Sequence, residues 1–514
     1  MKSRFASCFA LATAFTQATC SIIAAKKSTD QCTRDADCAR FPGTICDTLQ
    51  RVCVAGDGGL GPADEMDTGC MRSATNGTPA CFSCTPSVPS EFLNACTSAQ
   101  CVPFDNTARI AGFAPGQALR DPIVNPPPAP SDAGAATATD AGASTAPRCS
   151  QLTPPPVYVM ASSALSLSLQ TFAQALAPEV TFVYKYATSC PSLDSVLTGN
   201  TKLAGTAQYW SGTTPLDCTL DEAKPAEIAG CDVAPETCVP GYTGDPNLVD
   251  TTGPVQVFMF TVPRASTQTA ISAEAAYNVF GFGANSGVEP WSEPSLIFVR
   301  DLTSGVQLTL GTTIGLPPNS WHGVRIAASN QLKPTLLATS DPERTIGPTS
   351  ADQADAQDAR ANLRTLSYQH YDQNCGYLPD STIGSYDKRN VRDGHYVLWA
   401  PYHFYTRGSA GHTADPRVAN VVAYLSGAKP LPNRNTDLIT TLKQGGLVPS
   451  CAMRVTREKE GAPIVPFKPS PSCGCYYDIT SPGGIVPPEC TPCTQNADCM
   501  SARPICSFGY CETD

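Results

Sequence analysis

Hydrophobic positions follow two different periods after residue 156. The run 157–160 is short, continuous and apolar, as in a buried strand. Apolar side chains then recur at helical spacing, at Leu165, Leu169, Phe172 and Leu176. The succession repeats with a strand at 180–188, a helix that opens at Pro191, and a third strand at 203–210. This β-α-β-α-β order predicts a parallel sheet with right-handed crossovers.

The alternation continues through the second half of the chain. Strands are predicted at 255–262, 296–299, 344–347 and 396–405. Helices are predicted after Ser272, around 306–314, and over 351–367, 415–426 and 436–444. About 300 residues of mixed α/β exceed a single core, so we expect an α/β domain of two lobes.

The N-terminus has the pattern of a secretory signal. Lys2 and Arg4 precede an apolar stretch at 5–18, which is too short to span a membrane. We expect a signal peptide at 1–25 and favour simple cleavage, with lipid attachment at Cys20 as the alternative. The mature chain is thus expected to be secreted, periplasmic or at the cell surface.

Cysteines change this picture, because the chain contains 25 of them. Four cysteines recur at similar spacing near both ends, at Cys32, Cys38, Cys46 and Cys53 and at Cys493, Cys499, Cys506 and Cys511. Such short modules need disulfides to fold, and most of their gaps are wider than those of zinc knuckles. The Cys81-Phe82-Ser83-Cys84 motif is also expected to serve structural disulfides. Without the cysteines at positions 8 and 20, the chain has 23 cysteines. Because this number is odd, one thiol is expected to lack a partner within the chain, and Cys149 is the first candidate.

Composition divides the chain. Residues 116–156 are rich in Pro, Ala and Gly with almost no aliphatic content, as in a linker. The predicted segments are a signal peptide (1–25), a cysteine-rich region (26–115), the linker (116–156), the bilobed domain (157–455) and a C-terminal cysteine-rich module (470–514).

Charge and histidine content exclude several classes. A net charge of −11 argues against nucleic-acid binding, and five His with none paired at i,i+4 leave little for a metal site. His395 could form an acid–base pair with Asp393 or His403, but no nucleophile motif accompanies it. We therefore expect no catalytic residue, no metal, no cofactor and no enzymatic activity.

Three predicted strands end in hydroxyl-bearing turns that open helices. These turns contain Ser162 and Ser163, Ser189, and Ser304 with Gly305. Free N–H groups at a helix start attract anions, although Ser and Thr there can equally be simple caps. Arg300, four residues before Ser304, could grip an oxyanion or carboxylate with two N–H groups, the alternative being an interlobe salt bridge.

Several short motifs occur in the order found in one family. They are Ala161-Ser162-Ser163, the segment 271–281 leading to 288–292, Val299-Arg300 with Ser304-Gly305, Ile346-Gly347, and the segment 394–399. From 157 to about 451 the chain thus resembles a type II periplasmic solute-binding protein, in particular the phosphate-binding components of ABC transporters.

The resemblance implies two lobes that close on a ligand. The first lobe would comprise 157–254 and 392–450, and the second 255–391. The ligand contacts would come from the three turns and Arg300, that is, from Ser162, Ser163, Ser189, Arg300, Ser304 and Gly305. Two departures stand out: Val306 replaces the Thr of those relatives, and the stretch 204–208 lacks the carboxylate that accepts the ligand's proton in them.

Two functions remain open from the sequence. The first is a secreted solute-binding protein that captures a small anion, either a phosphate-like oxyanion or a small organic acid, with or without a membrane transporter as partner. The alternative is a surface or matrix protein whose bilobed domain has lost its ligand and whose cysteine-rich modules bind other macromolecules.

Overall fold

The computed structural model describes residues 81–122 and 146–513, apart from 178, 212–213, 432–436 and 484–485, together with short strands nearer the N-terminus. The chain forms two compact units, 1–68 and 69–514. The expected signal peptide, Cys20 and most of the expected linker lie outside the described residues.

The described part of the first unit is a hairpin of two antiparallel strands, β1 (Thr44–Asp47) and β2 (Val52–Ala55). In the second unit, β3 (Arg72–Ser73) pairs with β4 (Cys81–Phe82), before the short helices α1 (Pro89–Leu93) and α2 (Asn106–Arg109).

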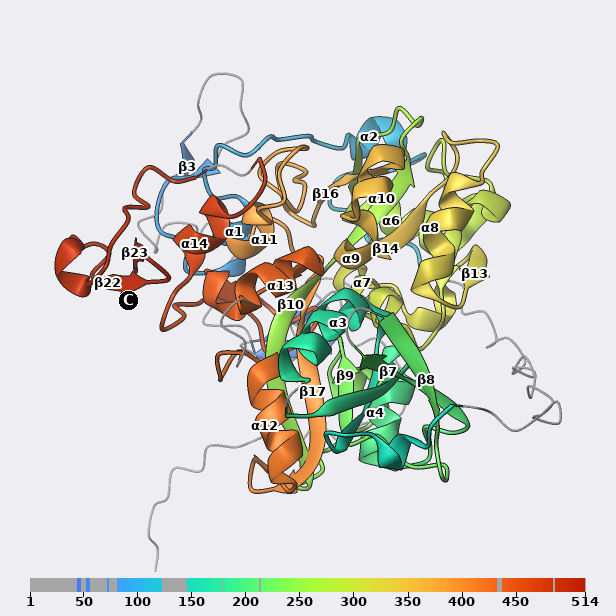
Figure 1. Ribbon diagram of the computed structural model, residues 1–514. Helices are drawn as coiled ribbons and strands as arrows, with labels where there is room; N and C mark the ends of the chain where they lie inside the picture. Colours follow the sequence, from blue (N-terminus) through green and yellow to red (C-terminus); the bar gives the residue numbers. More distant parts are fainter. Residues whose placement is uncertain are drawn as a thin grey trace, which may run out of the picture. The chain divides into compact units, whose positions relative to one another are not determined.

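An eleven-stranded mixed sheet dominates the second unit (Figure 1). Its path runs β14, β10, β17, β9, β5, β6, β7, β8. The strands are β5 (Pro156–Ala161), β6 (Thr181–Tyr186), β7 (Thr206–Ser211), β8 (Thr214–Thr219), β9 (Ile228–Cys231), β10 (Leu248–Pro263), β14 (Gly347–Ser350) and β17 (Trp399–Ser409). The short strands β15 (Leu363–Thr365) and β19 (Leu447–Val448) also pair with β10, and β18 (His412–Thr413) pairs with β17.

Strand β5 is apolar throughout because both of its faces are covered. Val157 and Val159 pack in one core cluster with helices α3 (Ser166–Leu176), α12 (Pro416–Leu425) and α13 (Leu438–Gln444). Tyr158 and Met160 point to the other face, toward α4 (Ser189–Leu197). The period-2 alternation of a strand thus divides one run between two cores. These elements, with β5–β9, form the first lobe.

The prediction for the third strand of the parallel unit is wrong in both its direction and its position in the sheet. Strand β7 runs antiparallel to β6 and forms a hairpin with β8. The strand that lies parallel to β5 on its other side is β9, which comes after that hairpin. A hairpin needs only a tight turn, so the 203–210 pattern alone does not distinguish it from a crossover.

The second lobe gathers shorter strands around helices. Strand β12 (Phe298–Arg300) pairs in parallel with β13 (Val324–Ile326), and β11 (Ala270–Ser272) with β16 (Ser367–Gln369). The helices are α6 (Ala273–Phe282), α7 (Gly305–Ile314), α8 (Ser329–Leu337), α9 (Ala351–Ala354) and α10 (Gln357–Asn362). Ser272 caps α6 as predicted, since its side chain accepts a hydrogen bond from Ala275 N at 3.0 Å. The fold is therefore a two-lobed α/β architecture.

The helix predicted over 351–367 is wrong in its second half. Helices α9 and α10 occupy 351–362, and the chain then becomes extended in β15 and β16. Residues 363–365 pair with the end of β10, from Thr261 to Pro263. Pairing with an existing strand edge prevails over local helix propensity here.

The C-terminal part of the cysteine-rich region 26–115 packs against the α/β domain. Phe92, Leu93, Phe104 and Ile110 belong to the same core cluster as α6 and α7. A disulfide joins Cys101 to Cys375. Residues 81–110 are therefore part of the second unit's core.

Disulfides correct one cysteine prediction and confirm another. Cys149 is not free, because it pairs with Cys218 on β8, and the free cysteine among the described residues is the buried Cys231. Cys81 pairs with Cys96, so the Cys-x-x-Cys motif serves structural disulfides as expected. The other described disulfides are Cys190–Cys238, Cys451–Cys473, Cys475–Cys490, Cys493–Cys506 and Cys499–Cys511.

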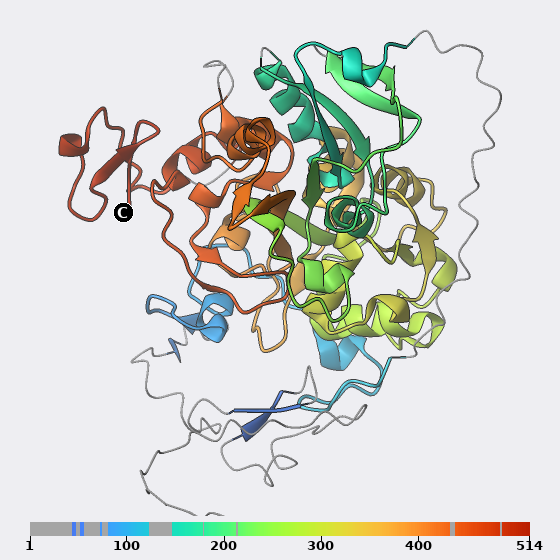
Figure 2. The ribbon, with the colours of Figure 1, turned by 90° about the horizontal axis from the view of Figure 1, so that it is seen from below.

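Each of the two terminal modules contains a two-stranded hairpin. Strands β22 (Ile505–Ser507) and β23 (Tyr510–Glu512) place Cys506 opposite Cys511, as β1 and β2 place Cys46 opposite Cys53. Hairpin β22–β23 lies close to α14 (Gly474–Ile479), whose Cys475 N donates to Glu512 Oε1 at 2.6 Å. In the second unit, Figure 2 shows the N-terminal part of the first lobe (teal) and the second lobe (yellow-green) as two groups, while the later helices of the first lobe and the C-terminal segments are orange and red. None of the helices in the described part of the chain has the length and apolar character needed to cross a membrane.

Candidate functional site

The six residues singled out in the sequence meet at one cavity. Its volume is about 220 Å³ and it opens between the two lobes. The lining residues are Ser162, Ser163, Tyr186, Ala187, Thr188, Ser189, Asp232, Arg300, Ser304, Gly305, Val306, Ala327, Ala328 and Ser329. All three predicted turns and Arg300 thus converge there.

Arg300 is fixed at the end of β12 by its own lobe. Its Nη1 donates to Ser329 Oγ at 2.7 Å, Nε to Ile326 O at 3.3 Å and Nη2 to Ala327 O at 3.4 Å. A guanidinium has five N–H donors, so these bonds leave two that no described residue takes up. The side chain is only 2% exposed, and no carboxylate within the described segments forms an ion pair with it. The interlobe salt bridge that the sequence left open is therefore absent from the described part of the chain.

Burial also affects the charge of Arg300. Desolvation lowers its pKa, while Asp352, Asp232 and Asp301 act in the opposite direction. A guanidinium has so high a pKa that it stays charged at neutral pH. The cavity therefore holds a buried cation that is oriented by neutral partners.

The turn after Arg300 is shaped by Asp301. Its carboxylate accepts hydrogen bonds from Thr303 N at 2.9 Å and from Thr303 Oγ1 at 2.6 Å. Ser304 is the N-cap of α7, and its side chain makes no capping bond. Ser304, Gly305 and Val306 line the cavity, so the N-terminus of α7, the positive end of its helix dipole, lies at the cavity wall.

Helix α4 of the first lobe begins at the same place. Thr188 Oγ1 lies 2.6 Å from Thr303 Oγ1, and Cys190 N donates to Thr303 O at 3.3 Å. These bonds join the start of α4 to the turn that opens α7. Two helix N-termini from different lobes therefore point at one small space, which concentrates positive potential there.

A carboxylate does line the cavity, although the stretch 204–208 has none, and it belongs to Asp232. It follows directly after β9, lines the cavity and is 1% exposed. The Ser189 hydroxyl donates a hydrogen bond to Asp232 Oδ1. Burial raises the pKa of Asp232, while Ser189 and Arg300 partly offset this effect.

Gly305 owes its identity to this carboxylate. A Cβ at position 305 would overlap the carboxylate of Asp232 and lie 2.6 Å from Ser189 Oγ. Only glycine lets α7 of the second lobe approach the first lobe so closely.

A sequence signal for Asp232 did exist. Ile228–Cys231 is a short apolar run followed at once by a polar residue, the form that also revealed Ser162 and Ser189. The prediction of 203–210 as the third parallel strand left no place for this strand in the expected sheet. In the sheet, the carboxyl ends of β5 and β9 lie side by side, which brings Asp232 near Ser162.

The first turn has its own support. Ser162 Oγ lies 3.2 Å from the hydroxyl of Tyr402, a fully buried residue of β17, and Ser162 N donates to Gly230 O at 3.0 Å. Asp352 of α9 adds a second buried carboxyl near the cavity. Burial raises its pKa to about 6, and the charge of Asp232 contributes to the rise.

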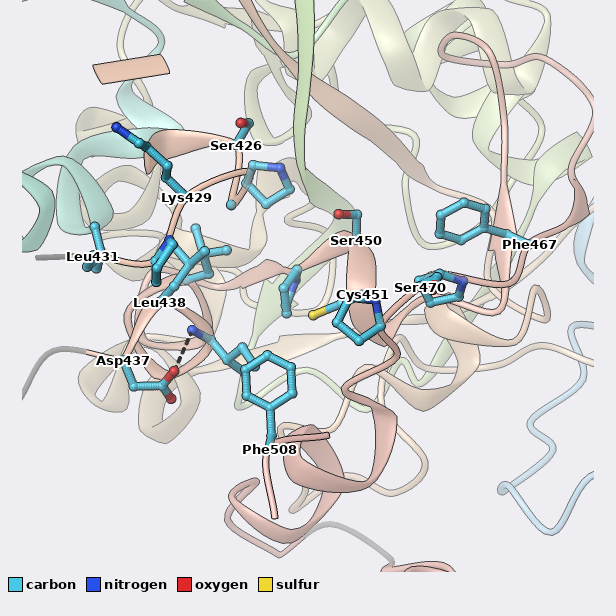
Figure 3. Close-up of a pocket in the computed structure, with 18 residues that line it drawn as sticks. Ser426, Lys429, Leu431, Asp437, Leu438, Ser450, Cys451, Phe467, Ser470 and Phe508 are labelled. Atoms are coloured by element: carbon cyan, nitrogen blue, oxygen red, sulfur yellow. Dashed lines mark hydrogen bonds between the residues drawn. The ribbon is translucent and has the colours of Figure 1, made fainter. Parts of the chain in front are cut away.

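Two other features do not form the site. His395 is buried and held between Asp393 Oδ1 at 2.8 Å and Ala95 O at 2.9 Å, which ties the N-terminal segment to the body. A larger cavity of about 650 Å³ lies between α13 and the C-terminal segment (Figure 3). Its lining is mainly Pro, Leu and Phe, and its Asp437 already caps α13. Neither arrangement offers converging donors for a small anion.

No family model and no curated protein sequence matches the chain. Among solved structures, the chain is similar to a protein of Clostridium perfringens described as a phosphate ABC transporter substrate-binding protein with bound phosphate. The identity is 10%, the TM-score is 0.41, and the match covers 57% of this chain and 99% of the other. An ABC-type phosphate transport receptor from Vibrio cholerae matches at 12% identity and TM-score 0.37, over 57% and 99% of the two chains.

Structures with another role are also similar. The reduced OxyR regulatory domain from Pseudomonas aeruginosa matches at 9% identity and TM-score 0.31, over 52% of this chain and 95% of the other.

Proposed function

We propose that this protein is an exported, non-enzymatic solute-binding protein that captures a small oxyanion between its two lobes. The observation that carries the proposal is the convergence of Arg300, the N-termini of α4 and α7, and the buried Asp232 on one cavity. The Arg300 guanidinium and the dipoles of α4 and α7 favour an anion, and the serine hydroxyls at the cavity add hydrogen-bond donors.

Asp232 favours a particular kind of anion. A buried carboxylate repels a fully deprotonated oxyanion, because no proton lies between the two negatively charged groups. An anion that still carries a proton can instead donate a hydrogen bond to Asp232. Monohydrogen phosphate has such a proton at neutral pH and sulfate has none. We therefore favour phosphate-like oxyanions over sulfate and over small carboxylates.

Contacts between the lobes support a closing mechanism. Thr188 and Thr303 meet across the cleft, and Gly305 packs against Asp232. Both pairs join a first-lobe residue to a second-lobe residue beside the cavity. A ligand held by both lobes would stabilise this closed arrangement and exclude water from the charged groups.

Calorimetric titration of the purified mature chain at pH 7 tests the proposal. Phosphate, sulfate and acetate are injected separately into the same protein. We expect one site for phosphate and at least about tenfold weaker binding of sulfate and acetate. Equal binding of phosphate and sulfate would refute the role of Asp232, and no binding of any anion would favour the surface-interaction function that the sequence left open.

A further inference from the structure

A third cavity lies on the second lobe and shares no lining residue with the cavity between the lobes. Its volume is about 630 Å³. Part of the lining comes from Gln100 and Val102 of the N-terminal segment, and the rest from Arg264 after β10, Thr269, the region of α9 and α10, β15, β16 and the loop 378–386. The Cys101–Cys375 disulfide and the bond from Val102 N to Gly376 O, at 2.9 Å, hold the N-terminal wall in place. The cavity is therefore a built feature of this chain.

Four paired charges lie at this cavity, and two of them, Asp380 and Lys388, are buried. Arg360 pairs with Asp355 at 2.7 Å and with Asp380 at 2.9 Å, and Lys388 pairs with the same carboxylates at 2.6 and 2.8 Å. Burial alone would lower the pKa of Lys388, but both carboxylates raise it, so the amine stays charged. Two cations and two anions balance, and this cluster contributes no net charge.

Two further arginines line this cavity, and neither pairs with a carboxylate of the described residues. Arg264 follows β10 and is exposed, and its guanidinium contacts no partner among the described residues. Arg364 on β15 donates to the backbone carbonyls of Gln268 at 3.2 Å and Arg264 at 3.3 Å, and none of the described carboxylates pairs with it. Both residues line the cavity, which therefore carries an excess positive charge at its mouth.

Apolar side chains also line this cavity. Ile383 is 62% exposed although it is a large aliphatic residue, and it lines the cavity with Leu378 and Tyr386. The Tyr386 ring is itself held over Arg360, with the guanidinium carbon 3.4 Å from the ring centroid. An exposed apolar wall beside unpaired cations matches a ligand that has both an apolar body and an anionic end.

We propose that this cavity binds a small organic anion, with its carboxylate, sulfonate or phosphate group on Arg264 and Arg364 and its apolar body against Ile383 and Tyr386. The site is independent of the oxyanion cavity and uses the N-terminal segment as a wall. The protein would thus carry two anion sites of different size and polarity.

The probe for this proposal is anilinonaphthalene sulfonate, an aromatic body with one sulfonate, followed by its fluorescence on the mature chain. The neutral N-phenylnaphthylamine has a similar body without the charge and serves as the comparison ligand. We expect saturable binding of the sulfonate at one site and at least about fivefold weaker binding of the neutral compound. Equal affinity for both compounds would overturn the proposal.

Variants locate the site. Arg264→Ala removes an exposed side chain without a described partner, so the fold should tolerate it, and we expect about fivefold to tenfold weaker sulfonate binding. Gly384→Phe should block the cavity, since a Cβ at Gly384 meets open space, and Gly384→Ala is its matched control. Unchanged affinity in both Arg264→Ala and Gly384→Phe would place the probe elsewhere and refute the site. Arg300→Ala should leave sulfonate binding intact, which separates this test from that of the oxyanion site.

Discussion

The hydroxyl of Ser189, at the start of α4, donates a hydrogen bond to the carboxylate of Asp232, at the end of β9. Both side chains are buried, and both line the cavity between the lobes. This pair joins a helix start to a strand end within the first lobe, and Gly305 of the second lobe packs directly on it. The acidic group is thus held in place before any ligand arrives.

Asp232 should determine which anions bind. In Asp232→Asn the side chain no longer repels a fully deprotonated oxyanion, and its amide can donate to one. We expect sulfate to gain affinity and phosphate to lose it, so that their ratio changes by about tenfold or more. Calorimetric titration measures both. The exposed Asp217→Asn on β8 is the matched control, and an unchanged ratio in Asp232→Asn would contradict the assignment.

Gly305 should tolerate no side chain. In Gly305→Ala the new Cβ would overlap Asp232, so the lobes must separate or the carboxylate must move. We expect phosphate binding to fall by at least about tenfold, with a stability loss of about 1–3 kcal/mol from overpacking. Urea unfolding and calorimetry measure the two effects. Gly384→Ala makes the same replacement where a Cβ meets open space, and a comparable loss there would show that the effect is not specific.

Asp352 should make stability depend on pH. Burial raises its pKa from 3.8 to about 6, so between these values the folded state binds more protons than the unfolded state. The contribution of Asp352 to stability is therefore complete below about pH 3.8 and is lost as the pH rises toward 6. The change is on the order of 3 kcal/mol.

Urea unfolding of wild type and Asp352→Asn at several pH values isolates this effect. The Asn variant should gain stability relative to wild type as the pH rises from about 4 to 6, and the difference should then stay constant. A difference that does not vary with pH would mean that Asp352 titrates normally in the folded protein.

The C-terminal segment should be anchored by one buried ion pair. Arg392 of α11 (Arg389–Arg392) pairs with Asp478 of α14, and both side chains are only 2% exposed. Asp478→Ala leaves a buried guanidinium without its partner, which typically costs about 3–5 kcal/mol. Thermal unfolding should show a large decrease in Tm. Asp221→Ala breaks the exposed pair with Arg148 and should change little, so equal effects would contradict this account.

Cys231 should be unreactive in the folded protein. Its thiol is buried, hydrogen-bonded to Ser189 O at 3.2 Å, and burial raises its pKa well above the usual value. Thiolate is the reactive form, so iodoacetamide should label Cys231 only after denaturation without reductant. Peptide mass spectrometry identifies the labelled position. Labelling of Cys149 instead of Cys231 would contradict the disulfide pattern.

The sequence predicted the ends of secondary-structure elements better than their pairing. Ser162, Ser189 and Ser304 were found because a strand that stops at a hydroxyl-bearing helix start is a local pattern. The direction of β7 and the pairing of 363–365 with β10 depend on contacts between distant segments. Local periodicity does not contain that information.

The same limit explains the errors in the site and the cysteines. Asp232 was not predicted because its strand, Ile228–Cys231, was not predicted and 203–210 was expected to be the third parallel strand. Cys149 stands alone in the sequence, yet its partner Cys218 is 69 residues away on β8. Arg300 was identified correctly as a cavity residue, but the carbonyl and hydroxyl partners that orient it come from 326–329, which carried no signal.

Titration of phosphate into wild type and Arg300→Gln tests the central claim most directly, because Arg300 is the buried cation of the proposed site. Arg344→Gln is the control, since its side chain is partly exposed and pairs with the partly exposed Glu293 outside the cavity. Circular dichroism should verify that each variant is folded. We predict one-site phosphate binding in wild type and in Arg344→Gln, and a loss of at least about a hundredfold in Arg300→Gln. Wild-type phosphate affinity in a folded Arg300→Gln variant would contradict the account.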